Sequence, residues 1–149
     1  MQVVESTVIN APPDLVYGII ADYRSGHPSI LPDKYFTRMD VLEGGYGAGT
    51  VIDVRMKVMG VSARYKMLVS EPEPGRILQE EDRKAGVLTT FTVEVEQGGR
   101  QSCVTIETTM PVSDGLKGWI EQKMNPPIMR KIYREELALL AGVATRKTV

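Results

Sequence analysis

The sequence predicts an α+β domain in which a curved antiparallel sheet wraps around a long C-terminal helix. Three observations predict it: alternating apolar and polar residues in the middle of the chain, a helical apolar period after residue 113, and a proline-marked break near the start. A sheet and a helix with one apolar face each bury those faces against each other. With 149 residues, we expect one domain over residues 1–149.

The N-terminal part predicts one strand followed by one or two short helices. Residues 2–9 are rich in Val, Thr and Ile, which favours a strand. Prolines and an acid between Asn10 and Asp14 suit a break and the first turn of a helix. That helix should end near Asp22, and a second short helix is expected over residues 29–36. The first helix has one apolar face, formed by Val16, Ile19, Ile20 and Tyr23.

Five further segments are expected to be strands. Most alternate apolar and polar side chains with period two, which is typical of antiparallel strands that have one buried and one solvated face. Glycine-containing turns separate them, and the clearest hairpin signal is Gln97 to Arg100. The expected strands cover residues 51–59, 61–69, 76–82, 87–96 and 102–110.

A long helix is expected after Ser113, and the last five residues of the chain are expected to fray. Ser113 is a plausible N-cap, with Asp114 in the first turn. Pro126 and Pro127 should kink or break this helix, because each removes a backbone donor and crowds the previous turn. Its apolar stripe contains Leu116, Ile120, Met124, Ile128, Ile132, Leu139, Leu140 and Val143.

Composition excludes several classes of protein. The net charge of −1 argues against long-range attraction to nucleic acid. With one cysteine, Cys103, and one histidine, His27, we expect neither a disulfide framework nor a metal site. The N-terminus shows no leader pattern, and the near-apolar stretch from Leu137 to Ala144 is far shorter than a membrane span. We therefore expect a cytoplasmic protein without stable membrane insertion.

Four segments together carry a family resemblance. Val8 to Tyr17 runs from a strand into a proline-started helix, and Ile20 to Tyr23 ends that helix. Gly47 to Thr50 is a glycine-rich entry to a strand, and Glu71 to Arg76 is a proline-marked turn. In these features the chain resembles the START-like, Bet v 1-like (SRPBCC, helix-grip) superfamily. It is most similar there to polyketide cyclase/dehydrase and lipid-transport type proteins.

The resemblance covers nearly the whole chain, but its motifs are structural. It implies a helix-grip fold that binds a small hydrophobic molecule (lipid-, polyketide- or isoprenoid-like) between the sheet and the C-terminal helix. A carrier or sensor without a cofactor is the first hypothesis, because no catalytic constellation is visible. An aromatase/cyclase-type enzyme acting on a polyketide is the alternative. A protein-interaction module, resembling coenzyme Q-binding or chaperone co-factor relatives, is the second alternative. The protein could be a monomer or a homodimer.

A few residues are candidates for chemistry. If the protein is an enzyme, Tyr65, His27 and Tyr35 are the candidates for catalysis. An exposed loop histidine is nevertheless the favoured interpretation of His27, which lacks an orienting partner in the sequence. We expect the loop of residues 24–35 to be the lid of the cavity. The expected ligand-binding residues lie on the inward face of the sheet, on the long helix or beside this loop: Tyr23, Val54, Met56, Ala63, Tyr65, Met67, Phe91, Val93, Ile106, Trp119, Ile120 and Met124.

The acidic run Glu80, Glu81 and Asp82 has two interpretations. A solvated strand edge is favoured, since edge charges also block unwanted strand pairing. Strand alternation nevertheless turns either Glu80 or Glu81 inward, so that a buried acid remains open.

Overall fold

The structure is a computed structural model that describes residues 1–148, with side chains for all of them except residues 116, 117 and 119–124. Seven antiparallel strands form one sheet in the order β1-β7-β6-β5-β4-β3-β2. The elements in chain order are β1 (Gln2–Ile9), α1 (Pro13–Ala21), α2 (Gly26–Ile30), β2 (Phe36–Glu43), β3 (Val51–Val58), β4 (Val61–Glu73), β5 (Ile77–Asp82), β6 (Val87–Glu96), the 3-10 turn η1 (Gln97–Gly99), β7 (Gln101–Thr109) and α3 (Gly115–Lys147).

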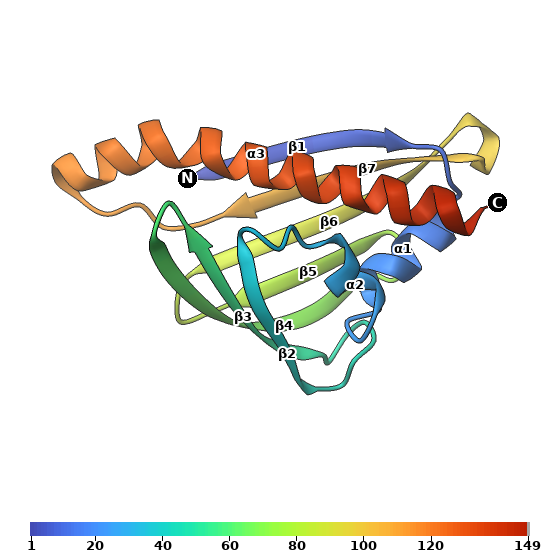
Figure 1. The fold of residues 1–149 in the computed structure, drawn as a ribbon, viewed down its shortest axis with the longest axis horizontal. Helices are drawn as coiled ribbons and strands as arrows, with labels where there is room; N and C mark the ends of the chain where they lie inside the picture. The colour runs from blue at the N-terminus through green and yellow to red at the C-terminus, as the bar shows by residue number, and fades with distance from the viewer. Residues whose placement is uncertain (149) are drawn as a thin grey trace.

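The sheet curves around α3, as Figure 1 shows, and this confirms the predicted helix-grip α+β fold. The helices α1 and α2 lie together near the C-terminal half of α3 (Figure 1). Strand alternation places the apolar side chains on the concave face: Ile52 and Val54 are buried in β3, and Val104 and Ile106 in β7. The core therefore lies between this face and the three helices.

The second helix begins earlier than predicted. We expected it over residues 29–36, and α2 spans Gly26–Ile30. The Asp22 carboxylate accepts hydrogen bonds from the Ser25 hydroxyl (2.6 Å) and the Gly26 backbone N–H (3.2 Å), which would otherwise lack partners. The Ser25 hydrogen bond, with these backbone donors, lowers the pKa of Asp22. Local capping by Asp22 thus folds a segment that its Gly and Pro content predicts to be a loop.

Gly26→Ala should destabilise the protein by about 1–3 kcal/mol, the typical cost of overpacking. The added Cβ would lie 2.5 Å from the carbonyl oxygen of Ile19, which is backbone and cannot swing aside. Gly18→Ala in α1 is the matched control, because its Cβ would meet only the Tyr46 hydroxyl at 3.7 Å and alanine favours helix by about 1 kcal/mol. Urea midpoints of both variants measure this, and equal shifts would contradict the close packing of α1 on α2.

Strand β2 is not predicted by the sequence pattern. Its exposed and half-buried residues do not alternate cleanly, and its pairing with β3 shifts register between Phe36 and Arg38 and again between Val41 and Glu43. β2 is also the last strand of the sheet. An edge strand with irregular pairing lacks the period-two signal on which strand prediction depends.

The expected break in the C-terminal helix is wrong. α3 runs uninterrupted from Gly115 to Lys147 and contains both Pro126 and Pro127. Residues after the prolines, such as Ile132 and Leu140, are buried against the rest of the molecule, and this packing keeps the segment helical despite the lost backbone donors. The N-cap is Asp114 rather than Ser113.

Candidate functional site

A cavity of about 100 Å3 lies between the concave face of the sheet and α3. It is several times larger than the roughly 10–15 Å3 that one water requires. Strands β2 to β7 supply one wall, and α2 and α3 supply the other. Most of the lining is apolar, including Leu31, Phe36, Ile52, Val54, Phe91 and Ile106.

Methionines form much of the apolar lining. They are Met39, Met56, Met67, Met110 and Met129, which come from three strands, the segment after β7 and α3. Methionine side chains are unbranched and flexible, so they can rearrange around guests of different shape. The lining can therefore adapt to a guest that the resting cavity does not fully match.

The first polar group in the cavity is Glu80, which points inward from β5. Its Oε1 accepts a hydrogen bond of 2.5 Å from the Tyr23 hydroxyl and lies 3.5 Å from His27 Nε2. His27 Nδ1 donates to the Ile20 carbonyl oxygen at 2.7 Å, which directs Nε2 toward Glu80. Burial, and then the charge of Glu80, raise the pKa of Tyr23. Glu80 is thus held from one side by the α1–α2 corner.

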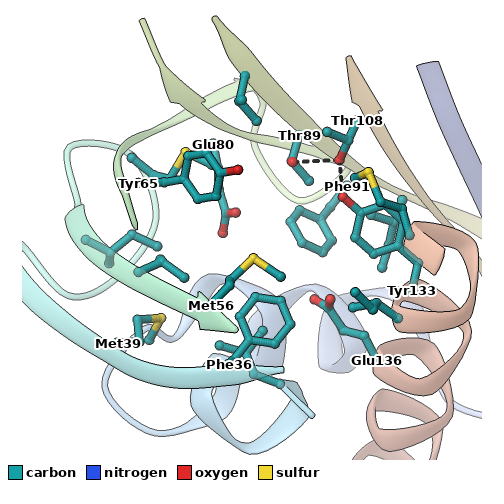
Figure 2. Close-up of a pocket in the computed structure, with 18 of the residues that line it drawn as sticks. Phe36, Met39, Met56, Tyr65, Glu80, Thr89, Phe91, Thr108, Tyr133 and Glu136 are labelled. Carbon is teal, nitrogen blue, oxygen red and sulfur yellow. Dashed lines mark hydrogen bonds between the residues drawn. The ribbon is translucent and has the colours of Figure 1, made fainter. Parts of the chain in front are cut away.

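The second polar group in the cavity is Glu136, which points inward from α3. It is 3% exposed. Burial first, and then the nearby charge of Glu80, raise the pKa of its carboxyl well above the usual range. Figure 2 shows the carboxyl groups of Glu80 and Glu136 pointing into the same space from the sheet and from the helix. The two acids together place two strongly polar groups in a mostly apolar cavity.

The third polar feature is a chain of three hydroxyl groups. Thr108 Oγ1 lies 2.7 Å from Thr89 Oγ1 and 2.5 Å from the Tyr133 hydroxyl (Figure 2). These hydroxyl groups satisfy one another, and burial raises the pKa of Tyr133. This chain joins β6 and β7 to α3 across the cavity wall.

The structure brings many of the predicted residues to the cavity. Those that line it are His27, Val54, Met56, Tyr65, Met67, Phe91 and Ile106. Tyr23 and Val93 are buried beside the cavity without lining it, and Ala63 and Tyr35 are half-buried and do not line it either. Trp119, Ile120 and Met124 lie outside the side chains that the structure describes.

The favoured interpretation of His27 as an exposed loop residue is wrong. His27 is 2% exposed and belongs to α2. Its ring stacks on Tyr23 with centroids 4.5 Å apart, and it meets the Phe91 ring nearly at right angles with centroids 5.6 Å apart. The sequence shows no orienting partner because the partners, Tyr23 and Glu80, come from other elements.

The expected solvated edge at residues 80–82 is also wrong. β5 is an interior strand, and both Glu80 and Asp82 are buried on its inner face. Asp82 accepts hydrogen bonds from the backbone N–H groups of Ala85 and Lys66, which lower its pKa. The structure instead shows the alternative that the sequence analysis left open, in which one glutamate of this run, Glu80, points inward.

The sequence reasoning missed Glu136, Tyr133 and the two threonines. A signal for Glu136 exists: it lies four residues after Ile132 and four before Leu140, within the apolar stripe of α3. An acid at that spacing faces the same way as its apolar neighbours.

Among the residues that the structure describes, no three His, Cys, Asp or Glu side chains gather as a metal ion would need. Nor, within those residues, does any helix have the length and apolar character that a bilayer span requires.

The curved sheet, the long helix and the apolar cavity between them define a helix-grip protein. The sequence profile of the family described as "Polyketide cyclase / dehydrase and lipid transport" matches residues 1–145. The chain belongs to this family, and its START-like, Bet v 1-like character is thereby confirmed.

Solved structures of other proteins share this fold. The KanY protein, known from a solution structure, is 29% identical, with a TM-score of 0.84 and 97% of each chain covered. The Zhui aromatase/cyclase from a Streptomyces species is 16% identical, with a TM-score of 0.77 over 100% of this chain and 96% of that one. A START superfamily protein from Mycobacterium smegmatis is 15% identical, with a TM-score of 0.66 and 97% of each chain covered. A search of curated protein sequences returned no significant match.

Proposed function

We propose that the protein binds a small hydrophobic molecule in the cavity between the sheet and α3, as a carrier or sensor. The observation that carries this proposal is the cavity itself, with its apolar, methionine-rich lining. Burying apolar surface is worth about 25 cal/mol per Å2, so such a lining favours an apolar guest without directional contacts. The few polar groups in the cavity would orient that guest.

Met56→Trp should abolish binding, because the larger side chain fills the cavity from β3. Figure 2 shows Met56 in the middle of the lining. Lys57→Trp is the matched control, since Lys57 is exposed on the other face of the same strand. Native mass spectrometry of freshly purified protein, followed by extraction with organic solvent, measures which variants retain a guest. Retention by the wild type and Lys57→Trp, with loss in Met56→Trp, is expected.

Retention of the same guest by a folded Met56→Trp variant would move the site elsewhere. If the wild type is purified empty, the same three proteins are titrated with a hydrophobic fluorescent probe. Equal binding of the probe by all three would then contradict the proposal.

A cyclase-type activity is the second candidate function. The observation that favours it is the pair of carboxyl groups in the cavity, because two acids in different environments can divide acid and base roles. Glu136, kept protonated by burial, would serve as the proton donor to an enol or carbonyl oxygen. The family description includes cyclases and dehydrases alongside lipid transport, so that both functions are within its range.

A further inference from the structure

We propose that the guest of this cavity is a hydrophobic molecule that carries a protonated amine, held between Glu80 and Glu136. This inference rests on the proposed function and specifies the chemical class of the ligand. It depends on three features of the cavity as its described side chains form it: an acid without a hydrogen-bond partner, a second acid that points into the same space, and a lining that contains no lysine or arginine.

Glu136 is a buried polar side chain that lacks a partner. It is 3% exposed, and no side chain or backbone group that the structure describes donates a hydrogen bond to it or forms an ion pair with it. Its neighbour on the helix, Tyr133, is already engaged with Thr108. Figure 2 shows the Glu136 carboxyl aimed into the cavity. A buried carboxyl without a hydrogen bond is costly, so a group that the guest brings is the natural partner.

Glu80 presents a second open acceptor to the same space. Both of its contacts, with Tyr23 and His27, use Oε1. Oε2 has neither contact and is left for the guest. An ammonium group has three donors and can therefore hydrogen-bond to Glu80 Oε2 and to Glu136 together.

The charged residues around the cavity also favour a protonated amine as the guest. Among the side chains that the structure describes, no lysine or arginine lines it. Two cations on or beside α3 are engaged by other acids, since Arg134 lies 3.9 Å from Glu5 and Lys34 lies 2.7 Å from Glu135. A carboxylate guest would add a third acid, and an apolar guest without a donor would leave the Glu136 carboxyl without a partner.

The protonation of Glu136 links binding to pH. The titratable groups around it are Glu80 from β5, Tyr65 from β4, Tyr133 from α3, His27 from α2, and Tyr23 from the segment between α1 and α2. Without a guest, burial and Glu80 keep Glu136 protonated above the usual pKa. A bound ammonium favours the charged carboxylate, so its binding displaces this proton to solvent.

The test compares three probes with the same apolar chain: octylamine, octanol and octanoate. Isothermal titration calorimetry of the wild type near neutral pH should show octylamine binding about ten-fold or more tightly than octanol, from charge-assisted hydrogen bonds. Octanoate should bind most weakly. Repeating the octylamine titration in two buffers of different ionisation enthalpy should reveal proton release, which a purely apolar contact would not produce.

Variants of three glutamates test which acids cause the preference for octylamine over octanol. Glu136→Gln should bring the ratio of octylamine to octanol affinity close to one, whereas Glu135→Gln, on the adjacent and partly exposed position, should retain the wild-type ratio. Glu80→Gln provides a second variant if Glu136→Gln does not fold. Equal binding of the three probes by the wild type would overturn the amine proposal while leaving hydrophobic binding intact. Failure of all three probes to bind would overturn both.

Discussion

Replacing Glu136 by glutamine should flatten the loss of stability that the protein shows as pH rises from mildly acidic to neutral values. In the folded protein, burial and the charge of Glu80 hold the pKa of Glu136 well above its usual 4.5. Below pH 4.5 the carboxyl is protonated in both the folded and the unfolded chain. Above it, the unfolded chain releases this proton and the folded chain retains it, so unfolding becomes more favourable with rising pH.

The slope of this effect is large. One proton retained only by the folded state lowers the free energy of unfolding by up to about 1.4 kcal/mol per pH unit, until the folded-state pKa is reached. Glutamine does not titrate, so the variant should lack this contribution. Urea midpoints of both proteins from about pH 5 to pH 8 measure the difference in slope.

Glu135→Gln is the control for this experiment. The hydrogen bond from Lys34 lowers the pKa of Glu135, so this residue contributes stability above its usual pKa that is lost as pH falls. The Glu135→Gln variant should keep the wild-type decline from acidic to neutral pH. Parallel pH curves for wild type and Glu136→Gln would mean that Glu136 is ionised at neutral pH, and would remove the proton-release step from the amine proposal.

Leu78→Ala should cost about 2–5 kcal/mol of stability, a large part of the 5–15 kcal/mol typical of a folded domain. Leu78 is fully buried on the inner face of β5 and lies opposite Phe91 in the register with β6. Removing its side chain loses apolar burial and leaves a second void beside the cavity, in a sheet held in place by continuous pairing on both sides.

Leu68→Ala is the matched control. Leu68 lies in β4, with its side chain on the outer face of the sheet, and is 43% exposed. Its truncation should cost less than 1 kcal/mol, because little surface is removed from contact with the protein. Urea midpoints measure both variants. Similar losses for the two leucines would contradict the assignment of the inner and outer faces.

Most strands could be predicted from sequence, including the edge strand β1, and the central strands carry the clearest signal. β3, β6 and β7 have neighbours on both sides and a regular apolar alternation, as in Ile52 and Val54. β2 and the bounds of α2 could not be predicted, because both elements depend on contacts with other parts of the chain. β2 pairs with only one strand, and α2 depends on the carboxylate of Asp22. Local patterns do not record such contacts.

The candidate site could also be predicted only in part. Apolar lining residues such as Met56, Met67 and Phe91 follow from strand alternation. The inward position of Glu80 and Glu136 could not be predicted in this way, because acids are normally assigned to solvent. Glu80 also lies within an acidic run that is typical of a surface. Which acids turn inward depends on the position of β5 in the sheet and on the rotation of α3, and both are set by tertiary packing.

The irregular pairing of β2 also bears on how the protein behaves at high concentration. A regular edge strand offers unpaired backbone groups to a strand of another copy and so promotes aggregation. On β2, the two register shifts interrupt that row, and Arg38 and Asp40 place an ion pair of 2.8 Å along it. The irregularity that hides this strand from sequence-based prediction thus discourages edge-to-edge stacking of molecules, and protects the solubility of a protein with almost no net charge.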